Sequence, residues 1–173
     1  MRKDLFVSKG VCWTPSNSAE VCSIKVYAES PGEGRVNIVG DISESVIQSI
    51  QAAIRLTASL GDIDENCFKH LNIKVSLPSP LAGDSMGLAI LVALYCAIKK
   101  RPVSLGTCIT GAISEDGSVR HVLGVREKVA AAKKAGLKKM IIPYENWSEV
   151  DMQEGVKIHP VKNLVETFLA LDL

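Results

Sequence analysis

Ser85 lies in a short glycine-flanked segment, Gly83–Asp84–Ser85–Met86–Gly87, in front of a long apolar run. A serine at the start of a helix is a candidate nucleophile, because glycine lets a substrate backbone approach and the N–H groups of the first turn can bind a developing oxyanion. The positive end of the helix dipole favours the same negative charge. The alternative is that Asp84 or Ser85 only caps the helix, since both residue types are favoured there.

Lys128 is the candidate base that such a serine needs, because a serine hydroxyl is a weak nucleophile while it holds its proton. In a helix expected over 125–135, Val125, Val129 and Ala132 share an apolar face, and Lys128 lies beside it. Burial there would lower the pKa of the lysine amine and allow it to accept a proton. The alternative is that Lys128 extends from the edge of this face to solvent.

Histidine is the usual base for a serine, and the chain has three histidines: His70, His121 and His159. None of them has a carboxylate at a spacing that would orient it as a base. A histidine-dependent triad therefore remains an alternative that the sequence does not support.

The elements that would position these residues form an α+β, α/β-like single domain over residues 1–173, in which a β-meander precedes mixed strands and helices. Strands 21–27 and 35–39 are expected to pair as a hairpin around the turn 31–34. Alternation and turn residues predict further strands at 72–77, 107–114, 118–123, 138–142 and 156–159. Helices are expected at 41–60, from 84 or 85 to 100, at 125–135 and at 163–171.

Composition excludes several classes of protein. The net charge is +1, with scattered Lys and Arg residues, so neither nucleic acid nor a membrane surface is an expected partner. The longest apolar stretch, Met86–Ile98, is too short to span a bilayer, and the N-terminus lacks the apolar core of a signal peptide. The five cysteines form no C-x-x-C pair, which argues against disulfides and structural zinc and favours a reducing, cytoplasmic location.

Several short segments, taken in order, resemble the proteolytic domain of Lon proteases. Val11–Cys12–Trp13–Thr14 is similar to the opening strand of that domain. The remaining matches are Gly83–Asp84–Ser85, Ala89–Leu94, Arg101–Pro102–Val103, Thr110–Gly111, Gly117–Ser118–Val119, Gly124–Lys128, Ala130–Ala131, Ala135–Gly136 and Ile141–Ile142–Pro143. The order of these segments, together with the spacing from Ser85 to Lys128, makes the resemblance specific.

The resemblance implies a Ser-Lys serine endopeptidase acting on unfolded proteins or peptides. Ser85 would be the nucleophile and Lys128 the general base, Thr110 would hydrogen-bond the lysine amine, and Gly83 and Asp84 would support the loop. It also implies a hexameric ring, with no cofactor or metal in this chain. Because no G-x-x-x-x-G-K-[ST] occurs in the sequence, ATP and Mg²⁺ would act only through a separate or removed AAA+ domain.

Four positions depart from the common pattern of the family. Asp84 stands where many members have proline, which is closer to the archaeal type, and Ala82 stands where they have an acidic residue. Ala112 replaces a glutamate, and Met86 replaces a small residue. These departures keep a second hypothesis open, namely a weak or inactive Lon-like oligomerisation or interaction module of an AAA+ protein in DNA repair or phage defence.

Overall fold

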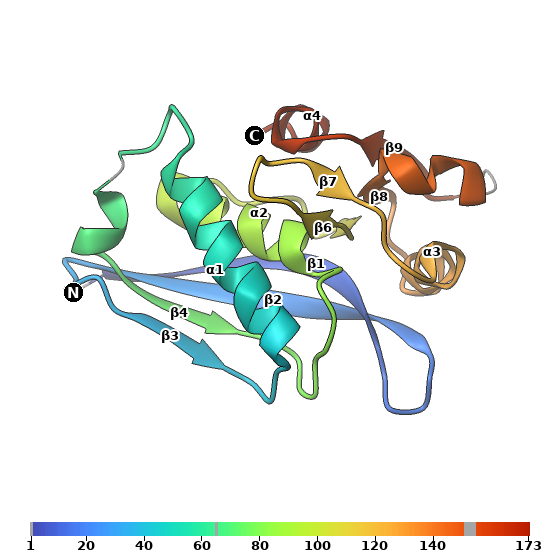
Figure 1. The fold of residues 1–173 in the computed structure, drawn as a ribbon, viewed down its shortest axis with the longest axis horizontal. Helices are drawn as coiled ribbons and strands as arrows, with labels where there is room; N and C mark the ends of the chain where they lie inside the picture. Colours follow the sequence, from blue (N-terminus) through green and yellow to red (C-terminus); the bar gives the residue numbers. More distant parts are fainter. Residues whose placement is uncertain (1, 65, 151–154) are drawn as a thin grey trace.

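A computed structural model describes residues 2–64, 66–150 and 155–173. Its largest sheet has the order β1-β2-β4-β3 (Figure 1). The strands are β1 (Arg2–Trp13), β2 (Ala19–Ser30), β3 (Val36–Val39) and β4 (Asn72–Ser76). β1 and β2 form a long antiparallel hairpin, β2 pairs antiparallel with β4, and β4 pairs parallel with β3.

The predicted hairpin between 21–27 and 35–39 is wrong. β2 is already paired on both edges, by β1 and by β4, so β3 reaches the sheet only beside β4. The turn at 31–34 packs instead on the segment that leads into β4, where Gly32 N donates to His70 O at 2.8 Å. Alternation of apolar residues predicts that a segment is a strand, but it does not name the strand's partner.

Helices α1 (Glu44–Ala58) and α2 (Gly87–Lys99) cover one face of this sheet (Figure 1). α2 packs on β1 and β2, and α1 packs on α2. Residues Gly87–Ala97 of α2 are all buried, because this helix lies between the sheet and α1. α1 begins at Glu44 and not near 41, because Ile42 forms a parallel bridge with Leu81.

The rest of the chain forms two smaller sheets. The parallel sheet β5-β8-β9 contains β5 (Thr107–Ile109), β8 (Lys139–Pro143) and β9 (Lys157–Val161), and the antiparallel pair is β6 (Ala112–Ile113) with β7 (Val119–Arg120). The helices of this part are α3 (Val125–Lys134) and α4 (Leu164–Leu171), and the chain also has 3-10 helices η1 (Cys67–His70) and η2 (Tyr144–Glu149).

The single strand expected at 107–114 is split into β5 and β6 at Thr110 and Gly111. Thr110 N still donates to Ile141 O of β8 at 3.0 Å, but Gly111 N turns to Ser85 O at 2.9 Å. The backbone therefore leaves one sheet and joins the loop in front of α2. This crossing brings three distant segments of the chain together.

Two apolar cores support the domain. The larger lies between the four-stranded sheet, α1 and α2, and the smaller contains the buried face of α3 with Val11, Cys108, Met140 and Ile142. The mixed α+β class is confirmed. No helix in the described ranges is long and apolar enough to cross a membrane.

Gly111 gives a packing prediction. A Cβ at this buried position would lie 2.9 Å from Val119 Cγ1 and 3.1 Å from Leu88 Cδ2. We expect Gly111→Ala to lower the free energy of unfolding by about 1–3 kcal/mol through overpacking. Urea unfolding of both proteins measures this difference.

Gly61→Ala is the matched control, because a Cβ at Gly61 would meet no atom within 4 Å. Its change should stay within about 0.5 kcal/mol. Equal effects of the two substitutions would contradict the packing around Gly111.

Candidate active site

Ser85 lies in a turn that precedes α2 and does not open the helix, so the predicted helix start at 84 or 85 is wrong. Gly87 N donates to Asp84 O at 2.9 Å, and Met86 occupies the N-cap position. Ser85 O accepts from Gly111 N at 2.9 Å, and this contact draws the backbone away from the helical path. Ser85 is half-buried at the end of an enclosed helix.

The loop that carries Ser85 is fixed on both sides. Gly83 N donates to the Ser45 hydroxyl at 3.2 Å, which ties the loop to α1. Gly83 has φ +86°, a conformation that residues with a side chain adopt with strain. Met86 is 1% exposed and fills the space beside Gly10, where a Cβ would collide with its thioether. The backbone of Ser85 is therefore held between two anchored neighbours.

Lys128 lies on α3 and is 1% exposed. It shares the buried face of α3 with Val125, Val129 and Ala132, as the apolar periodicity predicted. Among the buried side chains of the described residues, Lys128 is the only charged type. The alternative in which its amine extends to solvent is excluded by this burial.

Burial lowers the pKa of the Lys128 amine from 10.5 to about 8. Desolvation is the largest cause, because an apolar surrounding disfavours the ammonium form. The nearby Asp84 carboxylate opposes it by raising the pKa, as do Cys108, Cys12 and Cys22 to smaller extents. At pH 7, about a tenth of the amine therefore lacks its proton, far more than for an ordinary lysine.

Thr110 links the lysine to the serine loop. Lys128 Nζ donates to Thr110 Oγ1 at 3.4 Å, and Thr110 Oγ1 donates to Ser85 O at 3.3 Å. Thr110 itself is fully buried and held by its bond to Ile141. The structure thus gathers Ser85, Thr110 and Lys128 at one place, with Asp84 close enough to act on the amine electrostatically.

A groove lies at the loop before α2. It has a volume of about 480 Å³ and reaches Ala82, three residues before Ser85. Its walls come from the β1–β2 turn, the segment before α1 and the loop before α2, and consist of Trp13, Thr14, Pro15, Asp41, Ile42, Ser43, Pro80, Leu81 and Ala82. Ala82 leaves the groove without an acidic side chain from that position.

The cysteines around Lys128 were missed as a group, because they lie far apart in the sequence. The pairing of β1 with β2 places Cys12 and Cys22 on one face of the hairpin, and Cys108 lies in β5. All five cysteines are free thiols, and burial raises the pKa of the Cys108 thiol to about 12. No group of three His, Cys, Asp or Glu side chains in the described ranges is arranged to hold a metal ion.

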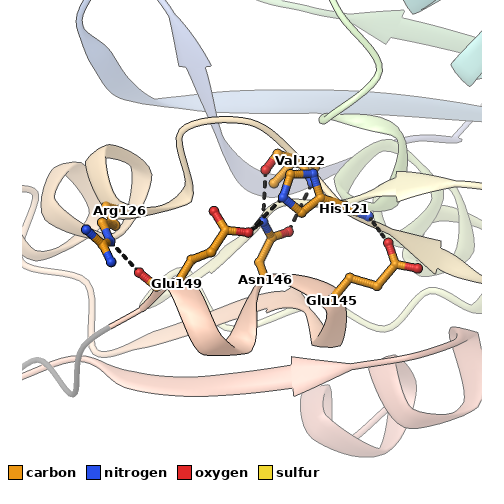
Figure 2. A network of polar contacts seen from close by, with 6 residues as sticks. All are labelled: His121, Val122, Arg126, Glu145, Asn146 and Glu149. Carbon is orange, nitrogen blue, oxygen red and sulfur yellow. Dashed lines mark hydrogen bonds and ion pairs between the residues drawn. The ribbon is translucent and has the colours of Figure 1, made fainter.

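The histidines lie in other surroundings. His121 Nε2 is 2.7 Å from Glu149 Oε1, a carboxylate partner that the sequence did not reveal (Figure 2). Desolvation, with Lys139 and Lys157, lowers the pKa of His159. The candidate base that the structure connects to the Ser85 loop is Lys128, through Thr110.

Comparison with known proteins assigns the family. The model of the Lon protease (S16) C-terminal proteolytic domain, which represents a family of serine peptidases, matches residues 2–171. The chain belongs to this Lon protease family.

Individual relatives agree with this assignment. The Lon protease of Trichlorobacter lovleyi is 34% identical over 183 residues, covering 99% of this chain and 22% of that protein. The Lon protease of Methylocella silvestris is 35% identical over 152 residues, which cover 84% of this chain and 18% of that protein. Lon protease 1 of Thermus thermophilus is 31% identical over 175 residues, which cover 95% of this chain and 22% of that protein. The chain spans about a fifth of the length of these curated relatives.

The buried amine makes stability depend on pH. The pKa of Lys128 is about 8 in the folded state against 10.5 ordinarily, so the unfolded chain binds more protons between these values. The free energy of unfolding should therefore rise with pH across this window, relative to a variant without the amine. Lys128→Met, which keeps the volume, is expected to be more stable at pH 7 by roughly 3 kcal/mol.

Urea unfolding of wild type and Lys128→Met from pH 7 to pH 10.5 measures this effect. The advantage of the variant should shrink as pH rises above about 8. Parallel stability curves over this range would show that the amine has an ordinary pKa.

Proposed function

We propose that this domain is a serine endopeptidase with a Ser-Lys dyad, in which Ser85 is the nucleophile and Lys128 the general base. The observation that carries the proposal is the fully buried Lys128 amine, joined through the Thr110 hydroxyl to the backbone of Ser85. Strong pKa perturbation beside a candidate nucleophile is typical of catalytic sites. An amine serving only as scaffold would have no reason to be buried, since burial destabilises its charged form.

In the proposed reaction, neutral Lys128 accepts the proton of the Ser85 hydroxyl as Ser85 Oγ attacks the peptide carbonyl. The resulting ammonium then protonates the leaving amine, and the peptide bond breaks to give an acyl-enzyme. Water, activated by the same amine, hydrolyses the ester and regenerates Ser85. Thr110 orients the amine throughout, because its oxygen accepts a hydrogen bond from Nζ.

The negative charge that develops on the carbonyl oxygen needs hydrogen-bond donors. Backbone N–H groups of the turn at Ser85 would supply them, because those of Gly87 and Leu88 in the first turn of α2 already donate to Asp84 O and Gly111 O. The positive end of the helix dipole would add to their effect. The space beside Gly83 is open, since a Cβ at its position would meet no atom within 4 Å.

The substrate is an unfolded protein or peptide, bound in the groove that ends at Ala82. The groove is open and lined mostly by apolar and small polar side chains, with Asp41 as its one charged residue, which suits an extended chain better than a folded surface. Its largest side chain is Trp13, whose indole also covers Gly124 at the start of α3. The same residue therefore lies between the proposed substrate and the helix that carries the base.

The wider setting is proposed from the family. The relatives are about five times as long as this chain, and we infer that a AAA+ ATPase, which would hold ATP and Mg²⁺, works with the domain in a cytoplasmic hexameric ring. The chain itself would hold no cofactor.

The weak or inactive interaction module remains the second candidate, because Ala82 and Ala112 remove two acidic groups from the surroundings of the dyad.

Cleavage of casein tests the dyad. Wild type should degrade it, whereas Ser85→Ala and Lys128→Met should lose at least about 100-fold in kcat, since each removes a reacting group. Lys133→Ala is the matched control, because Lys133 lies exposed in the last turn of the same helix and should leave the rate unchanged. Equal cleavage by all four proteins would refute the dyad, and no cleavage by any of them would favour the interaction module.

Asp84 gives a pH prediction. Its carboxylate raises the pKa of the Lys128 amine, so Asp84→Asn should lower that pKa further. The base would then lose its proton at lower pH, and the rising limb of the profile of kcat/KM against pH should shift to lower pH. A shift to higher pH, or none, would show that Asp84 does not act on Lys128.

A further inference from the structure

Asn146, on η2, is fully buried and pairs with the backbone of one residue (Figure 2). Its Oδ1 accepts from Val122 N at 3.0 Å, and its Nδ2 donates to Val122 O at 2.9 Å. One side-chain amide thus satisfies both backbone groups of Val122, as a neighbouring strand would. Val122 is itself buried, so neither group has water as a ready substitute.

Val122 stands two residues before Gly124, the N-cap of α3. Gly124 has φ +66° and no side chain with which to cap the helix. The Trp13 indole occupies the place where a Cβ would be, so a capping serine or aspartate does not fit there. The first turn that leads to Lys128 is therefore positioned by contacts from outside the helix.

η2 supplies these contacts. Besides Asn146, Glu149 O accepts from Arg126 Nε at 2.5 Å, and Glu145 Oε2 accepts from His121 N at 2.7 Å. Glu149 Oε1 accepts from Asn146 Nδ2 at 2.8 Å and lies 2.7 Å from His121 Nε2 (Figure 2). His121, Arg126 and Glu145 are exposed, whereas Asn146 is buried, so water can replace the outer contacts but not those of Asn146.

We propose that Asn146 is a positioning residue for catalysis: by pairing with Val122 it fixes the start of α3 and thereby places and shields the Lys128 amine. This inference rests on the proposed function. The bond from Lys128 Nζ to Thr110 Oγ1 is 3.4 Å long, near the limit for a hydrogen bond. A small displacement of α3 is therefore enough to break it and to admit water to the amine.

The charged and titratable groups that act on the Lys128 amine are Asp84, Cys12, Cys22 and Cys108. None of them lies on η2, so a substitution at Asn146 leaves them in place. The change expected at Lys128 is thus one of hydration and position, and hydration raises the pKa of the amine toward its ordinary value.

Three variants test the proposal: Asn146→Ala, Asn146→Ser and the control Thr167→Val. Asn146→Ser keeps a small polar side chain near Val122 without adding a charge, and it serves as the second variant should Asn146→Ala not fold. Thr167 is also fully buried and donates to Asn163 O at 2.9 Å, but it lies on α4. Casein cleavage across pH gives kcat, KM and the base pKa, and NMR titration of ε-¹³C-labelled lysine follows the Lys128 amine independently of activity.

We expect both Asn146 variants to lose about 10- to 100-fold in kcat with little change in KM, because a slightly displaced base slows chemistry more than binding. The inflection of the pH profile and of the Lys128 titration should both move above the wild-type value. Thr167→Val should lose stability without either shift.

Unchanged kcat and titration in folded Asn146 variants, or the same shifts in Thr167→Val, would overturn the positioning role. Failure of the proposed function can be told apart from failure of the positioning role, because the wild-type protein itself would then show no Ser85-dependent cleavage of casein. In that case the Lys128 titration alone decides: a higher pKa in the Asn146 variants supports the positioning of the amine, and an unchanged one contradicts it.

Discussion

A lysine amine enclosed by apolar side chains is the constraint on which this domain depends. An ammonium ion at position 128 is disfavoured by lost hydration, and the Asp84 carboxylate offsets only part of that loss. The amine therefore releases its proton more than two pH units below an ordinary lysine. The same burial that lowers the stability of the fold near neutral pH would make Lys128 a base there.

Holding that amine in place involves segments from across the chain. The split between β5 and β6 gives Thr110 two roles, since its backbone stays with β8 while its hydroxyl faces the lysine. The next residue, Gly111, donates its backbone N–H to Ser85 O, and this bond keeps the serine in a turn ahead of α2. On the far side, η2 fixes the uncapped start of α3. The site is thus held together mainly by hydrogen bonds to backbone groups, and few of its contacts join two side chains.

Local periodicity predicted the part of the site that lies on one helix. The spacing of Val125, Lys128 and Val129 is enough to place the lysine on the buried face of α3. Pairing across long distances was not predictable in this way, and the hairpin assigned to 21–27 and 35–39 was wrong because alternation does not identify a partner. Asn146 was missed for a related reason, since its amide acts on the backbone of a residue 24 positions earlier. Only the ordered motifs of the family linked Ser85, Thr110 and Lys128 before the fold was known.

The most direct test of this account is the titration of the Lys128 amine in the wild-type protein, followed by NMR of ε-¹³C-labelled lysine and assigned with Lys128→Met. The account predicts one lysine signal with an inflection near pH 8, well below those of the surface lysines. An inflection near 10.5 for Lys128 would contradict it, because an amine with an ordinary pKa is solvated, charged at neutral pH and unable to act as the base for Ser85.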